Sequence, residues 1–308
     1  MARRWTTRLA AGLLLVALVL SALYVVAARR IAGRETESGG TLPDGVPGRL
    51  IAVDGHRVHV VERGAGPAIL LVHGTAGTTL DWETSVVDDL ARDHRVIALD
   101  LYGMGFSDRD DRFDYGFELW TDQLAHTLDA LGVERASVIG QSLGGALSLV
   151  FAGRYPARVE RVVSVDSGPW MPSFLLLMLT PGIGETILAR ADYWPERPEQ
   201  GALYAERLRQ VYRIAGTRRS LLRALRGQFV DARTYFGGIA SVECPALLVH
   251  GDSDDIIPLR AARSLQRLLK QSELVVIPGG HFSMQDSPQR FLEVVRRFLN
   301  GLPADRPG

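Results

Sequence analysis

The sequence is poor in cysteine and lysine. Among its 308 residues, Cys244 is the only cysteine and Lys270 the only lysine. A single cysteine excludes a disulfide within the chain and any zinc site built on cysteine ligands. The formal net charge is zero, with 35 basic and 35 acidic residues, and no basic stripe is interleaved with aromatic residues. The composition therefore argues against nucleic-acid binding.

One long apolar run lies near the N-terminus. Leu9–Ala28 carries no charge, and about 20 apolar residues in a helix match a hydrocarbon core roughly 30 Å thick. Arginines flank both ends, at positions 3, 4 and 8 and at positions 29, 30 and 34. We interpret residues 1–32 as a single-pass membrane anchor that contacts the lipid bilayer. Residues 33–48, rich in Gly, Pro, Ser and Glu, are interpreted as a linker.

Two alternatives to an anchor remain open. A cleaved signal peptide normally has an apolar stretch of only about 7–15 residues, although Val26–Ala28 resembles a poor cleavage site. A core helix is rarely apolar on every face. The evenly divided arginines and the terminal amine favour a cytoplasmic N-terminus by a small margin. We therefore expect the catalytic domain on the non-cytoplasmic side.

The body of the chain alternates between strand and helix patterns. Leu50–Val53 and Arg57–Glu62 alternate apolar and polar residues around Asp54-Gly55, a strong hairpin signal. Short apolar runs typical of buried parallel strands follow at residues 69–72, 96–99, 136–139, 162–165, 246–249 and 274–277. Helical patterns lie between most of them. The pattern predicts an α/β fold with a doubly wound, mostly parallel sheet.

The alternation stops between Gly168 and Ser241. This stretch has helical patterning and no clear strand. We predict a helical cap at residues 169–240, inserted into an α/β core made of residues 49–168 and 241–303. The apolar run Phe174–Leu179 in this cap has three possible fates: it lines an acyl pocket, packs onto the sheet or touches the bilayer.

A nucleophile motif follows a predicted buried strand. Gly140-Gln141-Ser142-Leu143-Gly144 is a G-x-S-x-G sequence between that strand and a predicted helix. In this context the glycines allow a sharp turn that presents the serine hydroxyl at the end of the sheet. We therefore expect Ser142 to be a nucleophile.

A serine nucleophile needs a base, and the base needs an orienting acid. Where a G-x-S-x-G turn joins a strand and a helix of an α/β sheet, the order of these residues along the chain is serine, acid, histidine. Of the two histidines after Ser142, His250 ends a predicted strand and is expected to be structural. His281 lies in a Gly-Gly-His-Phe loop and is the expected base.

The acid is expected just after the strand at residues 246–249. Three aspartates, Asp252, Asp254 and Asp255, lie there; Asp254 fits best, and Asp166 is the alternative. A glycine-bearing loop at residues 73–77 follows another predicted strand. Backbone N–H groups of Thr75 and Leu143 are expected to form the oxyanion hole.

These motifs resemble a known family. HGTAG, DLYGMGFS, GQSLGG, GDSDDIIP and GGHF, in this order, resemble the α/β-hydrolase superfamily, in its branch of capped esterases, carbon–carbon hydrolases and metal-free haloperoxidases. The resemblance implies Ser142, Asp254 and His281 as the catalytic triad, Thr75 and Leu143 as the oxyanion pair, and no metal or cofactor. Dehalogenases and epoxide hydrolases of this fold have aspartate at the position of the nucleophile in this turn, so Ser142 argues against both. The turn DLYGMGFS is expected to line the cleft.

The function that follows is acyl transfer to water. We expect a carboxylesterase- or lipase-like serine hydrolase that cleaves ester or related acyl bonds of a small hydrophobic substrate through an acyl-enzyme. A carbon–carbon bond hydrolase or a haloperoxidase-like perhydrolase on the same triad is the alternative. A non-catalytic ligand-binding protein on the hydrolase scaffold is the alternative from another class, and it would be expected to have lost a member of the triad.

Overall fold

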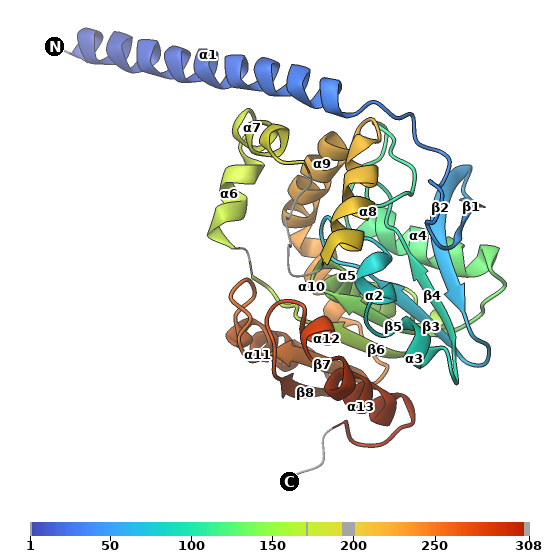
Figure 1. Ribbon diagram of the computed structural model, residues 1–308. Helices are drawn as coiled ribbons and strands as arrows, with labels where there is room; N and C mark the ends of the chain where they lie inside the picture. Colours follow the sequence, from blue (N-terminus) through green and yellow to red (C-terminus); the bar gives the residue numbers. More distant parts are fainter. Residues whose placement is uncertain (1, 171, 193–200, 305–308) are drawn as a thin grey trace.

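The centre of the molecule is an eight-stranded sheet. The computed structural model describes residues 2–170, 172–192 and 201–304, in which the strand order is β1-β2-β4-β3-β5-β6-β7-β8 (Figure 1). The strands are β1 (Arg49–Val53), β2 (His56–Arg63), β3 (Ala68–Val72), β4 (Arg95–Leu99), β5 (Ala136–Gln141), β6 (Val159–Val165), β7 (Ala246–Gly251) and β8 (Ser272–Ile277). β2 is antiparallel to both neighbours, and all other pairs are parallel. The predicted doubly wound, mostly parallel sheet is confirmed.

Helices cover both faces of the sheet, which explains its apolar strands. In β3, Leu70 and Val72 pack on one face while Ile69 and Leu71 pack on the other. The first face carries α4 (Phe117–Ala130), α5 (Leu143–Arg154), α10 (Ala232–Ala240) and α11 (Leu259–Leu268). The second carries α2 (Leu80–Glu83), α3 (Val87–Leu90), α12 (Ser283–Asp286) and α13 (Pro288–Leu299). A short 3-10 helix, η1 (Pro156–Arg158), precedes β6.

In the described residues between β6 and β7 there are five helices. They are α6 (Ser173–Leu179), α7 (Ile183–Arg190), α8 (Gly201–Arg213), α9 (Thr217–Val230) and α10. The first four share an apolar cluster of their own, which includes Met178, Leu188, Leu208 and Leu225. α10 instead packs on α5, where a Cβ added to Gly153 would lie 1.9 Å from the carbonyl oxygen of Gly238. The helices α6 to α9 thus form a second layer above the carboxyl ends of the strands (Figure 1).

Helix α1 (Ala2–Arg34) extends beyond the body along its upper edge in Figure 1. From Arg8 to Arg34 it is long and apolar enough to cross a membrane, with a mean hydropathy of 2.7 and none of its apolar window buried in the protein. Its second half runs beside α7. A Cβ added to Gly182 would lie 2.6 Å from the carbonyl oxygen of Leu20.

The stretch after α1, expected to be a linker, packs against the cap. The carboxylate of Glu35 accepts hydrogen bonds from the backbone N–H groups of Gly216 (2.7 Å) and Arg218 (2.9 Å). The backbone of Glu37 pairs with the segment around Ile214 in a short parallel bridge. These contacts fix the direction in which α1 leaves the body.

Candidate active site

Ser142 lies on a strained turn between β5 and α5. Its backbone has φ 54° and ψ −115°, a region that costs a non-glycine residue free energy and is often found at functional sites. The turn is tightly packed. A Cβ on Gly140 would lie 2.0 Å from the carbonyl oxygen of Gly144, and one on Gly144 would lie 2.2 Å from that of Val72. These two positions admit only glycine, which explains the G-x-S-x-G spacing.

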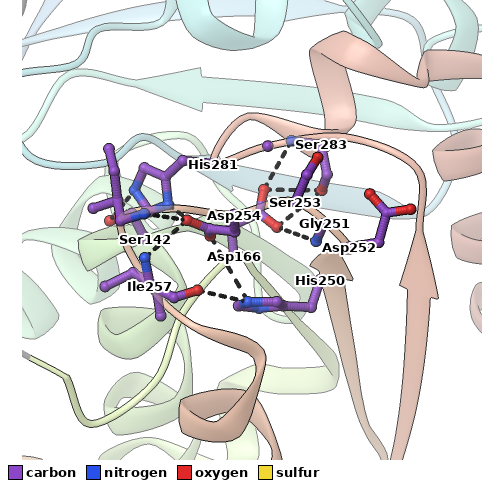
Figure 2. Close-up of polar contacts among 12 residues, drawn as sticks. Ser142, Asp166, His250, Gly251, Asp252, Ser253, Asp254, Ile257, His281 and Ser283 are labelled. Carbon is purple, nitrogen blue, oxygen red and sulfur yellow. Dashed lines mark hydrogen bonds and ion pairs between the residues drawn. The ribbon is translucent and has the colours of Figure 1, made fainter.

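His281 links Ser142 to Asp254 (Figure 2). Its Nε2 lies 3.1 Å from the Ser142 Oγ, and its Nδ1 lies 2.9 Å from the Asp254 Oδ2. The Asp254 side chain is buried, and its other oxygen accepts the backbone N–H groups of Ile256 (2.9 Å) and Ile257 (2.8 Å). Since the carboxylate accepts from Nδ1–H, Nε2 is free to accept the serine proton. The structure therefore brings all three expected triad residues together.

The remaining aspartates occupy other positions. Asp166, at the end of β6, is buried and accepts the backbone N–H groups of Gly251 (2.8 Å) and Ser283 (2.9 Å). Burial raises the pKa of its carboxyl to about 6, against the opposing effect of His281. Asp252 and Asp255 are exposed. Among the described aspartates, Asp254 alone forms a hydrogen bond with the His281 ring.

Two further histidines act as braces. The His250 Nε2 donates to the carbonyl oxygen of Ile257 (2.8 Å). The His73 Nδ1 donates to the carbonyl oxygen of Gly74 (2.7 Å), and its Nε2 accepts the backbone N–H of Leu101 (3.0 Å). Both rings are fully buried. The position of His250 agrees with the structural role expected for it, and His73 has a similar bracing position.

One cluster has the spacing of a metal site. The ligand atoms of Asp166, His250 and Asp254 lie within 4.8 Å of one another, the single such group in the described part of the chain. However, all four carboxylate oxygens already accept hydrogen bonds from N–H or O–H groups. The cluster is therefore part of the polar network that holds the triad.

A cavity of about 380 Å³ opens above Ser142 and His281. Its lining comes from the core residues Thr75, Phe117, Gln141, Leu143, Ala146, Ile256, Ile257 and Phe282, and from residues 167–170, Pro172, Leu175, Gln228, Tyr235 and Phe236 between β6 and β7. Thr75 and Leu143, the expected oxyanion pair, thus border the same cavity as Ser142. No Asp, Glu, Lys or Arg in the described ranges lines it, so the cavity suits an uncharged ligand.

The turn at residues 100–107 does not line this cavity, so that expectation was wrong. Its first residue, Asp100, is buried and accepts the backbone N–H groups of Thr79 and Phe106, each at 2.7 Å. The pKa of this carboxyl is lowered by the facing His59 ring despite its burial. The turn also contacts the cap, where the Ser220 hydroxyl donates to the carbonyl oxygen of Gly103 (2.7 Å). Its function here is to support the cap.

Several residues of the cavity lining were not predicted from the sequence. Gln141 precedes Ser142, and its side-chain amide donates to the carbonyl oxygen of His281 (2.7 Å). The G-x-S-x-G motif marks its position but gives no reason for its side chain. Gln228, Tyr235 and Phe236 reach the cavity from the cap. No sequence pattern distinguishes such cavity-facing residues from packed ones.

Comparisons with known proteins agree with this architecture. Residues 67–209 match a family model described as alpha/beta hydrolase fold. The chain is 33% identical over 273 residues to 2-hydroxy-6-oxo-2,4-heptadienoate hydrolase from Pseudomonas putida, covering 82% of this chain and 96% of that protein. The chain belongs to the α/β-hydrolase family.

Other similarities support this assignment. This α/β-hydrolase is 30% identical to 2-hydroxymuconate semialdehyde hydrolase from a Pseudomonas species, over 82% of this chain and 93% of that protein. It resembles the crystal structure of the enol-lactonase from Burkholderia xenovorans with a TM-score of 0.68 and 22% identity, over 82% of this chain and all of that one. The structural likeness shows the shared fold, and the sequence relatives show that this chain is a hydrolase.

Proposed function

We propose that this hydrolase cleaves the bond beside a carbonyl carbon in a small, uncharged and mostly apolar substrate. Ser142 acts as nucleophile, His281 as base and Asp254 as the acid that orients the base. The observation that supports this most strongly is the unbroken series of contacts from Asp254 through His281 to Ser142, at 2.9 Å and 3.1 Å, on the wall of the cavity.

The proposed chemistry proceeds in two halves. His281 takes the proton of the Ser142 hydroxyl as its oxygen attacks the carbonyl carbon, and the backbone N–H groups of Thr75 and Leu143 donate to the resulting oxyanion. The bond to the leaving group breaks, the leaving group receives the proton from His281, and an acyl-enzyme remains. Water, deprotonated by His281, then attacks the acyl carbon and releases Ser142.

The relatives favour a carbon–carbon bond as the one that is broken. A 2-hydroxy-6-oxo-2,4-heptadienoate has a ketone and no ester, so hydrolysis of that compound must break a carbon–carbon bond. The relative named for it is 33% identical to this chain over nearly its whole length. We therefore place carbon–carbon hydrolysis beside a ketone ahead of the carboxylesterase or lipase activity expected from the sequence.

Ester hydrolysis is the second candidate, and one observation favours it. The substrate named for the relative is a carboxylate, yet the described lining of this cavity has no Arg or Lys to pair with one. Burying an unpaired carboxylate costs several kcal/mol. A neutral ester meets no such penalty.

Two substrate panels distinguish the candidates. One panel consists of neutral conjugated dienol ketones and their carboxylate-bearing analogues. Their turnover is measured by the loss of the dienol absorbance. The other consists of p-nitrophenyl esters of increasing chain length. Turnover of ketones supports carbon–carbon hydrolysis, and turnover of esters alone supports the second candidate. Ser142→Ala serves as the control for both, because it must abolish any activity that uses the triad.

We also propose that α1 anchors the enzyme in a bilayer as a single pass. Its length, its mean hydropathy of 2.7 and the exposure of its apolar residues support this. The catalytic domain is proposed to lie on the non-cytoplasmic side. Sequencing the N-terminus of the native protein distinguishes an anchor from a cleaved signal peptide.

A further inference from the structure

The segment at the start of the cap is apolar on two sides. From Trp170 to Gly184 it contains no charged residue. In α6, Leu175 is 9% exposed and lines the cavity. Its neighbours Leu176 and Leu177 are 55% and 54% exposed. Two adjacent exposed leucines, on a helix whose other side borders the substrate cavity, need a partner that tolerates apolar side chains.

The same segment touches α1. The close approach of Gly182 to the Leu20 carbonyl places the α6–α7 turn beside the middle of the apolar run Leu9–Ala28. Eight residues separate Leu20 from Ala28, which corresponds to roughly 12 Å along a helix axis. If α1 lies in lipid, the α6–α7 turn therefore lies beside its lipid-embedded part rather than at its end.

The charged residue of α7 that lies nearest to the α6–α7 turn, Glu185, is buried. Glu185 is 7% exposed. Its carboxylate accepts the backbone N–H of Gly182 (2.7 Å) and pairs with Arg226 (3.0 Å). Because the charge is neutralised inside the cap, it does not oppose contact between the α6–α7 turn and an apolar phase.

Arginines gather at the other end of α7. Arg29, Arg30, Arg34 and Arg190 border a hollow of about 490 Å³. Arg34 pairs with Asp192 (3.1 Å). In the part of the chain that the structure describes, the other three have no acidic partner. Guanidinium groups where an apolar helix ends suit the phosphate groups of an anionic lipid surface.

We propose that α6 and the α6–α7 turn dip into the acyl-chain region of the bilayer beside α1, with Arg29, Arg30 and Arg190 at the level of the lipid phosphates. Trp170, Pro172 and Leu175 line the cavity from this same segment, so an apolar substrate passes to Ser142 directly from the lipid. The contact with lipid stands independently of the reaction. The delivery of substrate rests on the proposed function.

A quenching experiment tests the contact with lipid. Leu176→Cys and Leu177→Cys variants of the full chain are labelled with an environment-sensitive fluorophore and reconstituted into phosphatidylcholine–phosphatidylglycerol vesicles. The matched control is Leu302→Cys, because Leu302 is 52% exposed and follows α13, at the end of the molecule away from α1 (Figure 1). The unaltered chain, with its partly buried Cys244, gives the background.

The outcomes are distinct. We expect labels at 176 and 177 to emit at shorter wavelength and to lose most of their fluorescence when nitroxide quenchers are attached to the acyl chains, while the label at 302 does neither. Labels at 176 and 177 that behave like the control overturn the proposal. Labels that are shielded from water but insensitive to the lipid quencher indicate a second copy of the chain on this face, which also overturns it.

A charged variant tests delivery. In Leu176→Glu/Leu177→Glu, the rate on a water-soluble p-nitrophenyl ester should be unchanged, because neither residue lines the cavity. The rate on a long-chain ester dissolved in vesicles should fall by about tenfold or more, because carboxylates are expelled from the lipid interior. Equal losses on both substrates, or none, reject delivery from lipid. If the unaltered enzyme cleaves neither ester, ester hydrolysis has failed while the quenching result stands, and the comparison is repeated with vesicle-dissolved and water-soluble ketones.

Discussion

The carboxylate of Asp166 accepts hydrogen bonds from both the backbone N–H (2.9 Å) and the hydroxyl (2.8 Å) of Ser283, two residues after His281. Its other oxygen accepts the backbone N–H of Gly251 (2.8 Å). Asp166 therefore ties the ends of β6 and β7 to the loop that bears His281, whereas Asp254 contacts the ring itself. Two buried carboxylates near one histidine thus have separate structural positions, and their substitutions should differ in effect.

Asp254→Asn should reduce turnover by about 10⁴-fold, because an amide at this position favours the wrong tautomer of the orienting histidine. Asp252→Asn is the matched control: Asp252 is exposed and, within the described ranges, accepts only the Gly279 N–H (3.2 Å). The measurement is kcat on a p-nitrophenyl ester or the rate of labelling by a fluorophosphonate. A fully active Asp254→Asn variant beside an inactive Asp166→Asn variant would reverse the assignment of the acid.

Burial of Asp166 should make stability depend on pH. Its pKa is about 6 in the folded chain and near 3.8 when unfolded, so the folded state holds the proton more tightly between these values. The free energy of unfolding should therefore fall as pH rises from about 4 to 6, by at most about 3 kcal/mol from this group. Urea unfolding at several pH values measures the slope. Asp166→Asn should remove this contribution, and identical slopes in both proteins would refute it.

Ser142→Ala should abolish hydrolysis and fluorophosphonate labelling, with a loss on the order of 10⁶ in turnover. The fold should persist, because the Ser142 backbone N–H, which donates to the Val165 carbonyl (2.8 Å), is unchanged by the substitution. Circular dichroism and thermal unfolding check the fold. Retention of most of the activity and of the label would remove Ser142 from the proposed mechanism.

The strands and the placement of Ser142, Asp254 and His281 could be predicted from the sequence because both depend on local patterns. Ser142 follows β5 directly, and Asp254 and His281 follow β7 and β8, so parallel strands bring them to one edge of the sheet. The cap could not be predicted in the same detail. A run of six apolar residues has no polar position to mark its faces, so nothing in Phe174–Leu179 distinguishes cavity-facing Leu175 from exposed Leu176.

Leu175→Ala should move the preference of the enzyme toward longer or bulkier acyl chains, because it enlarges the cavity. Each additional methylene buried there adds about 0.8 kcal/mol, roughly fourfold in kcat/KM. Leu176→Ala is the matched control, since Leu176 points outward. A chain-length series of p-nitrophenyl esters measures the optimum. The same optimum in Leu175→Ala and the unaltered enzyme would show that this leucine does not limit the chain length.

The contacts of Glu35 predict where the chain can be shortened. Glu35 lies 3.5 Å from the guanidinium of Arg218, whose side chain is 1% exposed, and it accepts two backbone N–H groups at the start of α9. Removing residues 1–34 keeps these interactions. We expect that variant to leave the membrane fraction, remain soluble without detergent and keep the stability of the body.

Removing residues 1–40 should lower the free energy of unfolding by about 1–3 kcal/mol relative to the variant that lacks residues 1–34. The longer deletion leaves the buried guanidinium of Arg218 and two backbone N–H groups without the Glu35 carboxylate. Urea unfolding of the two truncated proteins measures the difference. The control is Glu35→Gln in the protein that lacks only residues 1–34. It should reproduce part of the loss, because the amide can accept hydrogen bonds but has no charge to pair with Arg218. Equal stability of both truncations would mean that residues 35–40 act as a free linker, and only the packing of α1 beside α7 would then orient α1 relative to the cap.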